Sequence, residues 1–368
     1  MFNLFNLHCP RLPAEVDATL KGIVHSLIAF ALAIVALVLF WIRPCKIQKE
    51  KVKNILVIKL ERIGDLVLSL AAIHLLKRSF PDSAITLVIN EYSRAIVASD
   101  PDIHEIVVYG DGSFTAIVDR LRKKRFDLAI DLTARRLFFL PAFLSFFSGA
   151  KVRIGLNNGG RGFLFTNKVK PFSELRYHSE EMLHILDPLG LGTSSASRKL
   201  MISQADVLHI EDYLRGNYVK AGTIVCIHVG GSFKKQFWPA ENYAAVIDRI
   251  MFKNKGCVVL VGAGEVEQIL VSEILLLLKS GIKVINSLGQ ISLGQTMALI
   301  SKCDLFIGNS SGPLHIAVAR DIPTISFLSP DDAVRWKPVG DMHVTFDLKT
   351  ATIEGVSLAI NNRLLSGR

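Results

Sequence analysis

Short apolar runs alternate with segments of helical periodicity along most of this chain of 368 residues. In the first half, strands are predicted over 54–60, 84–89, 105–109 and 128–132, and helices over 66–78 and 113–123. Strands without polar alternation that are separated by helices are typical of a parallel sheet with both faces covered. Residues 54–200 are therefore predicted to form an α/β domain built on a parallel sheet.

The same alternation restarts after a polar stretch near residues 192–203. Strands are predicted over 223–229, 258–261, 284–286, 304–307 and 324–327, and helices over 240–253, 265–279 and 292–302. We therefore expect a second α/β domain over 221–345 and a C-terminal helix over 346–368 that packs back on the first domain. Two such domains enclose a cleft, and ligands of open α/β sheets bind outside the carboxyl ends of the strands.

An apolar stretch without any charged residue, 22–41, precedes both domains. It has the length of a helix that crosses a bilayer, and it is longer than the apolar part of a cleaved signal peptide. Five cationic residues follow it within residues 43–53, whereas two precede it. By the positive-inside rule, the two domains should lie on the cytoplasmic side. We expect a short segment over 1–21, a single-pass anchor over 22–42 and a basic linker over 43–53.

The formal net charge of +10 is partly concentrated in the linker and in residues 120–125, where it would favour an anionic membrane surface. Basic and aromatic residues do not alternate as in RNA-binding motifs, so nucleic acid is not expected as a partner. The segment Leu137–Ala150 carries five phenylalanines between basic flanks and is too short to span a bilayer. It is predicted either as a buried helix behind the first sheet or as a helix that touches the membrane surface.

The loop best suited to bind an anion follows the strand predicted over 304–307. The strand ends in a Gly-Asn-Ser-Ser-Gly turn, and a helix begins behind Pro313. Free backbone N–H groups, two hydroxyls and the positive end of a helix can together hold a phosphate or diphosphate. The candidate ligands here are Asn309, Ser310, Ser311, Gly312 and His315.

Two further loops of the second domain carry candidate residues. A basic loop either approaches an anionic ligand or is simply solvated, and its candidates are Gly230, Gly231, Ser232, Lys234 and Lys235. Glu265 follows a Gly-Ala-Gly turn, and it either accepts hydrogen bonds from a ribose or sugar hydroxyl or caps the next helix. No strand ends in G-x-G-x-x-G with an acid about 20 residues further on, which argues against a dinucleotide-dependent oxidoreductase.

The turn after the first strand of the chain holds the remaining candidates. Gly64 allows a tight turn, and Asp65 at the helix cap either serves only as a cap or takes a proton from an attacking hydroxyl. The Asp-Pro-Asp sequence over 100–102 matches a metal-binding DxD pattern but lies in an ordinary turn context. The ten histidines show no HxxxH or HExxH spacing, so no metal site is predicted.

These motifs, in this order, resemble glycosyltransferase family 9, which contains the lipopolysaccharide heptosyltransferases. The matching segments are 54–81, Arg153–Gly155, His178–Gly192, Trp238–Pro239, Leu288–Leu293 and Ser311–Ala317. They extend over most of residues 53–339. The sequence departs from the family pattern at two positions: Ser310 stands where an aspartate is usual, and Gln236 where a lysine is usual.

The resemblance implies a GT-B fold, in which two Rossmann-like domains face each other across a cleft. It implies an inverting glycosyltransferase without an essential metal or cofactor. The nucleotide-sugar donor, with ADP-heptose among the candidates, would bind mainly on the C-terminal domain. The acceptor would be a lipopolysaccharide core or a related lipid-linked glycan at the inner membrane. A non-catalytic scaffold that binds nucleotide sugars or glycans is the alternative.

The resemblance also assigns roles to particular residues. Asp65 would be the catalytic base that deprotonates the acceptor hydroxyl. The donor diphosphate would be stabilised by the helix start at Ser311 and Gly312 and by one lysine of the pair over 234–235. The acceptor side of the cleft would contain Lys59, Arg62 and Gly64.

Overall fold

The computed structural model describes residues 45–191, 200–217, 219, 222–231, 237–253, 257–279 and 284–366. The expected N-terminal segment and the anchor over 22–42 lie outside these residues, as do 43–44 of the expected linker. Within the described part of the chain, no helix is both long enough and apolar enough to cross a membrane.

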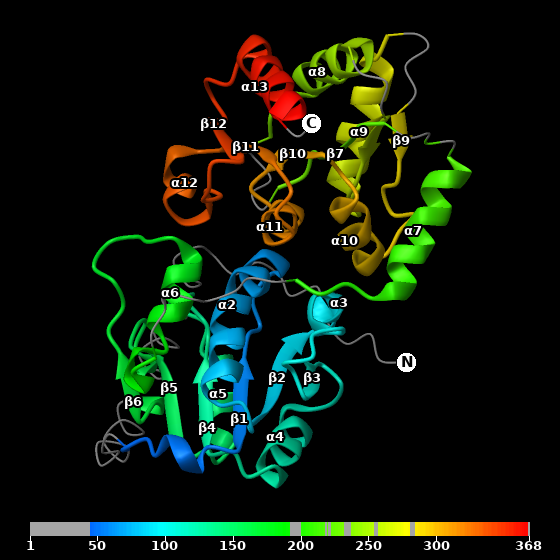
Figure 1. Cartoon of the computed structure of the whole chain (residues 1–368). Helices are drawn as coiled ribbons and strands as arrows, with labels where there is room; N and C mark the ends of the chain where they lie inside the picture. Colours follow the sequence, from blue (N-terminus) through cyan, green and yellow to red (C-terminus); the bar gives the residue numbers. More distant parts are fainter. Residues whose placement is uncertain are drawn as a thin grey trace, which may run out of the picture. The chain divides into compact units, whose positions relative to one another are not determined.

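The first domain is built on a sheet of six parallel strands in the order β3-β2-β1-β4-β5-β6 (Figure 1). The strands are β1 (Asn54–Ile58), β2 (Ala84–Asn90), β3 (Glu105–Tyr109), β4 (Leu128–Asp131), β5 (Val152–Leu156) and β6 (Asn167–Val169). The helices are α2 (Ile63–Ser79), α3 (Arg94–Val97), α4 (Phe114–Lys123), α5 (Leu140–Phe147) and α6 (His178–His184). Short 3-10 turns occur at Lys49–Lys51, Glu91–Ser93, Arg161–Leu164 and Asp187–Leu189.

Both faces of the first sheet are covered, as the unbroken apolar strands predict. Ile55 and Val57 of β1 join a core with α2, α3 and α6, whereas Leu56 and Ile58 face α4 and α5. Because alternate residues of a strand point to opposite faces, a central strand with two covered faces needs apolar residues at every position.

The second domain repeats this architecture in the order β12-β11-β10-β7-β8-β9, again with parallel pairings. Its strands are β7 (Ile224–His228), β8 (Cys257–Leu260), β9 (Val284–Asn286), β10 (Leu305–Asn309), β11 (Thr324–Leu328) and β12 (His343–Asp347). Its helices are α7 (Gln204–Gly216), α8 (Ala240–Lys253), α9 (Glu265–Leu277), α10 (Leu293–Ser301), α11 (Gly312–Ala319), α12 (Pro330–Trp336) and α13 (Ile353–Ser366).

The C-terminal helix differs from the expectation. Helix α13 packs on α8 and on strands β10 and β11, and its residues Val356 and Ile360 are buried in the core of the second domain. The expected packing on the first domain is therefore wrong. The reason is that β12, which was not predicted, extends the second sheet and brings the chain end next to α8. This strand was missed because it is only half-buried at every position.

The two domains contact each other through α2 and α11, which Figure 1 shows between the two sheets. Side chains of both helices belong to one hydrophobic core cluster, which includes Leu66 and Leu70 of α2 and Leu314 and Ile316 of α11. Each of these helices follows the carboxyl end of a central strand. Their first turns therefore meet at the edge where ligands of such sheets bind.

Candidate functional site

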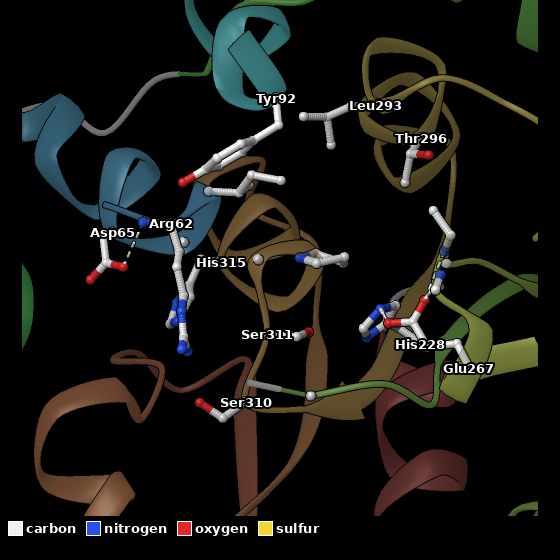
Figure 2. Close-up of a pocket in the computed structure, with 18 of the residues that line it drawn as sticks. Arg62, Asp65, Tyr92, His228, Glu267, Leu293, Thr296, Ser310, Ser311 and His315 are labelled. Carbon is white, nitrogen blue, oxygen red and sulfur yellow. Dashed lines mark hydrogen bonds and ion pairs between the residues drawn. The ribbon is translucent and has the colours of Figure 1, made fainter. Parts of the chain in front are cut away.

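A cavity of about 560 Å³ lies between the carboxyl edges of the two sheets. Figure 2 shows residues of both domains around it. The first domain contributes Arg62, Ile63, Gly64, Asp65 and Tyr92. The second domain contributes the start of α11, the β8–α9 turn, the first turn of α10, and the side chains of His228, Glu267 and Trp336.

The first turns of α2 and α11 pack tightly against each other because both carry glycine. A Cβ atom on Gly64 would lie 2.8 Å from Cδ2 of His315. A Cβ atom on Gly312 would lie 2.9 Å from Cγ2 of Ile63. The two helix starts thus line one cavity, so two positive dipole ends are directed at the same space. Gly64, expected to contact the acceptor, also serves this packing.

Asp65 is the third residue of α2, not its cap as the sequence suggested. Arg62 is the N-cap residue, and its backbone N–H donates to Oδ2 of Asp65 over 3.1 Å. The other oxygen, Oδ1, lies 3.3 Å from Nε2 of His178, and the side chain is 15% exposed. One oxygen therefore fixes the helix start, whereas the other faces a histidine at the cavity wall.

A network of charged side chains holds His178 from behind. Nδ1 of His178 lies 3.3 Å from Oε2 of Glu181 and 3.3 Å from a guanidinium nitrogen of Arg335. Arg335 also pairs with Glu181, so α12 of the second domain is ionically linked to α6 of the first. Trp336 packs on the histidine ring, with ring centroids 4.8 Å apart. The orientation of this imidazole is therefore set by both domains.

Lys59 is fully buried beneath Asp65. Its side chain is therefore not available to contact the sugar acceptor, contrary to the expectation. Its ammonium donates to Glu61 over 2.6 Å and to the carbonyl of Leu132 over 2.7 Å. It lies 3.4 Å from Nε2 of His178. Burial raises the pKa of the Glu61 carboxyl, but the charges of Lys59 and His178 outweigh this effect and lower the pKa.

Two groups of side chains among the described residues have a geometry that could hold a cation. In the first, Glu61, Asp65 and His178, the Lys59 ammonium already supplies a positive charge 2.6 Å from Glu61. The second group surrounds Asp100. Oδ2 of Asp100 lies 2.8 Å from Nε2 of His74, and Oδ1 accepts a hydrogen bond from the backbone N–H of Asp102 over 3.0 Å. Asp100 therefore holds its own turn together, which favours the turn interpretation of the DxD sequence.

The second carboxylate of the cavity is Glu267, whereas the expected Glu265 is exposed and does not line the cavity. Oε1 of Glu267 lies 3.1 Å from Nε2 of His228, and Oε2 accepts the N–H groups of Ala263 (2.7 Å) and Gly264 (3.1 Å). Burial raises the pKa of Glu267, but the imidazole and the two N–H groups outweigh it and lower the pKa to about 2. The group is thus ionised at neutral pH.

Glycines make room for this carboxylate. A Cβ atom on Gly230 would lie 1.9 Å from Oε1 of Glu267, and one on Gly262 would lie 2.4 Å from Oε2. Gly262 also has a φ of +152°, which side-chain-bearing residues rarely adopt. The predicted Gly230 therefore backs the cavity acid, whereas its neighbour Gly231 lines the cavity itself.

The predicted anion loop lies at the middle of the cavity (Figure 2). Ser310, Ser311, Gly312 and His315 line it. Asn309 lies behind them, where its Nδ2 donates to the carbonyl of Val229 over 2.8 Å.

Two polar atoms in the cavity-lining part of this loop are buried without a hydrogen-bond partner among the described residues, namely Oγ of Ser311 and Nδ1 of His315. Oδ1 of Asn309, behind them, is a third such atom of the loop. Burial, and then the nearby His178, lower the pKa of His315 to about 3, so its ring is neutral. Because buried polar atoms are nearly always paired, these two atoms indicate that a polar ligand completes the site.

Of the remaining predicted residues, one lines the cavity and three are not described by the structure. Arg62 is exposed and extends across the cavity in Figure 2. Ser232, Lys234 and Lys235 lie outside the described residues.

The sequence reasoning missed His178, His228 and Glu267. Glu267 had a usable signal, because it stands three residues after Gly264, where the acid of a capping box is expected. The histidines had none, because the cavity acids that they contact, Asp65 and Glu267, are far away in the sequence.

Comparisons with known proteins found related sequences. The family model described as "Glycosyltransferase family 9 (heptosyltransferase)" matches residues 114–355. A lipopolysaccharide heptosyltransferase 3 of Escherichia coli is 25% identical over 302 residues, covering 77% of this chain and 85% of the relative. The lipopolysaccharide core heptosyltransferase OpsX of Haemophilus influenzae is 23% identical, covering 80% of this chain and 84% of the relative.

Solved structures share the fold. A glycosyl transferase family 9 protein from Veillonella parvula superposes with a TM-score of 0.77 at 20% identity, covering 85% of this chain and 97% of that one. The ADP-heptose lps heptosyltransferase II of E. coli gives a TM-score of 0.75 at 21% identity, with coverages of 85% and 99%. The two parallel sheets thus match the GT-B architecture of heptosyltransferase structures, as expected.

Proposed function

Because this chain belongs to glycosyltransferase family 9, we propose that it transfers heptose from a nucleotide-diphosphate donor to a lipopolysaccharide core or a related lipid-linked glycan. Two of its relatives are named lipopolysaccharide heptosyltransferases, which supports this acceptor class. A solved structure of the same fold is named an ADP-heptose heptosyltransferase, which supports ADP-heptose as the first donor to test. In this proposal, transfer inverts the anomeric carbon and needs no metal.

The order of groups along the cavity supports an orientation for the donor. In Figure 2, Glu267 and Asp65 lie at opposite ends, with Ser310, Ser311 and His315 between them. An ionised carboxylate is suited to accept hydrogen bonds from ribose hydroxyls, and a helix start is suited to bind a diphosphate. The nucleoside therefore lies at the Glu267 end, the diphosphate at the start of α11, and the sugar towards Asp65.

The single observation that carries the proposal is the Asp65 carboxylate at the opposite end from Glu267, in the wall of the same cavity as the anion loop. In this proposal Asp65 takes the proton of the acceptor hydroxyl while its oxygen attacks the anomeric carbon from the face opposite the diphosphate. The bond from that carbon to the phosphate oxygen breaks as the new glycosidic bond forms.

The charge that develops on the leaving diphosphate needs stabilisation. The start of α11, the hydroxyls of Ser310 and Ser311 and the guanidinium of Arg62 supply it. One of the two lysines over 234–235 is proposed to add a further positive charge. His178 is a positioning residue in this scheme, because it contacts Oδ1 of Asp65 from behind the cavity wall.

The setting of the reaction is also part of the proposal. We place the anchor over 22–42 in the inner membrane, with both domains on the cytoplasmic side. A glycosyltransferase with a lipid-linked acceptor would then meet that acceptor at the membrane surface.

Transfer assays with Asp65→Asn test the proposal, with ADP-heptose and purified core acceptor as substrates. We expect the variant to bind ADP normally in thermal-shift measurements while kcat falls by about 10²–10⁴, the usual contribution of a general base. Asp119→Asn on the exposed side of α4 is the matched control and should retain full activity. A folded Asp65→Asn enzyme with full turnover would exclude this role, and a wild-type chain without turnover on any nucleotide sugar would favour a non-catalytic scaffold.

A further inference from the structure

A partly exposed apolar stripe with arginines beside it lies on the outer side of the first domain, where Leu137 and Phe147 are exposed and the other members are half-buried. Phe139, Phe143 and Phe147 follow one another at intervals of one helical turn, with ring centroids 6.2 and 6.3 Å apart. Phe114 of α4 extends the stripe, 5.9 Å from Phe147, and Leu137 before α5 is 82% exposed. The other side of α5 is buried, with Leu144 packed in the core behind the sheet. The buried-helix interpretation therefore holds for one side of α5, and contact with a membrane stays a prediction for the other side.

Arginines lie next to this stripe and contact neighbouring parts of the same segment. The guanidinium of Arg135 lies 6.0 Å from the ring centroid of Phe138, and that of Arg153 lies 5.3 Å from that of Phe146. Nε of Arg122 donates to the carbonyl of Phe147 over 3.0 Å. Residues 114–153 contain nine cationic and three anionic side chains, a net charge of +6 out of +10 for the whole chain.

Charge distinguishes this face from another apolar one. Helix α9 also exposes large apolar side chains, with Ile269 at 61% and Leu276 at 86%. The charged residues within α9, however, are three glutamates and no lysine or arginine. Apolar side chains within a cationic border are typical of surfaces that lie on anionic bilayers, whereas an acidic border opposes such binding.

The start of the described chain lies close to the same face. The carbonyl of Cys45 accepts a hydrogen bond from Asn167 over 3.2 Å, and Thr166 next to it bonds the backbone N–H of Arg153 over 2.8 Å. Arg153 is the residue that lies on Phe146. In the sequence, only residues 43 and 44 separate Cys45 from the proposed anchor.

We propose that the α4–α5 face, defined by Phe114, Leu137, Phe139, Phe143 and Phe147 with their bordering arginines, lies on the surface of an anionic bilayer. The face also reaches the candidate site, because the backbone N–H of Arg135 donates to Oε1 of Glu61 over 3.2 Å. Glu61 in turn pairs with Lys59 below Asp65. A lipid-linked acceptor in that bilayer would approach Asp65 from this side. This last step rests on the proposed function, whereas the contact with lipid does not.

Photocrosslinking of the full chain in nanodiscs tests the contact. A benzoylphenylalanine at position 137 should form lipid adducts in nanodiscs with phosphatidylglycerol, measured by mass spectrometry, and the same probe at position 276 should not. The two positions are matched in exposure, so the comparison isolates the effect of the basic border. The double variant Arg135→Glu/Arg136→Glu should reduce the adduct by about fivefold or more, the effect expected per cationic side chain at such a surface.

Three outcomes would overturn the proposal: equal yields of lipid adduct at 137 and 276, adducts to protein in place of lipid, or a lipid-adduct yield that is unchanged in the charge-reversal variant. Thermal melting of each variant checks that it folds. Adduct formation does not require turnover, so an inactive but crosslinking chain would refute the proposed function and leave the membrane face intact. Extraction with alkaline carbonate tests the anchor separately.

Discussion

Glu267→Gln should lower both stability and donor affinity, and the size of the stability effect follows from the structure. The pKa of the carboxyl falls from 4.5 to about 2 on folding, and its side chain is 19% exposed. A shift of this size corresponds to about 3 kcal/mol of folding free energy at neutral pH. Since the folded-state pKa is lowered, this contribution is complete above pH 4.5 and is lost as the pH falls from 4.5 towards 2.

Urea unfolding of the full chain at pH 7 and at pH 3 measures the effect. Glu265→Gln, two residues away in the same helical turn, is the matched control and should change the free energy of unfolding by less than about 0.5 kcal/mol. Glu267→Gln should also weaken ADP binding at pH 7, measured by calorimetry, whereas Glu265→Gln should not. Equal effects of the two substitutions, or a Glu267 effect that does not shrink at low pH, would refute this reasoning.

Three further predictions concern other parts of the site. His178→Ala should lower kcat by about tenfold or more with little change in the donor KM, and His178→Gln should restore part of it; an unchanged kcat would remove the positioning role. Gly64→Ala should cost about 1–3 kcal/mol in urea unfolding, because its Cβ would lie 2.8 Å from His315, whereas Gly216→Ala in open space should be neutral or stabilising. Asp100→Asn should lower the melting temperature but leave kcat unchanged, both with and without EDTA. A folded variant that has lost activity would support the metal interpretation of the DxD sequence.

Much of the fold could be predicted from the sequence because strand burial leaves a strong local signal. The strand over 105–109 and the helix over 240–253 have the predicted bounds. Strands β5 and β6 were missed because their segments contain Arg153, Gly155 and Lys168, which interrupt the apolar pattern. β5 tolerates Arg153 because its guanidinium is bonded to the carbonyls of Leu164 and Ala150, partners that no local pattern reveals.

For the candidate site, the sequence identified one loop but not the partners of the charged side chains. The anion loop over 309–315 was found because a strand, a glycine turn and a helix start are consecutive in the sequence. His178 could not be assigned, since its partners Asp65 and Arg335 are 113 and 157 residues away and meet it only through the packing of the two domains. The same holds for Lys59, whose burial depends on Leu132 and Met182. Local patterns therefore identify loops, whereas the partners that tune each charged group come from tertiary structure.

The two cavity acids show that a contact at a helix start is compatible with the functional role proposed for the same side chain. Asp65 and Glu267 each stand at the third position of a helix that follows a strand end. In each, one carboxylate oxygen accepts N–H groups at the helix start, and the other faces Nε2 of a histidine, His178 or His228. The cap fixes the side chain, so that little orientational freedom is lost when a substrate binds. The helix-start contact and the proposed catalytic or binding role are therefore compatible, because the N–H groups at the helix start hold each acid in the cavity wall.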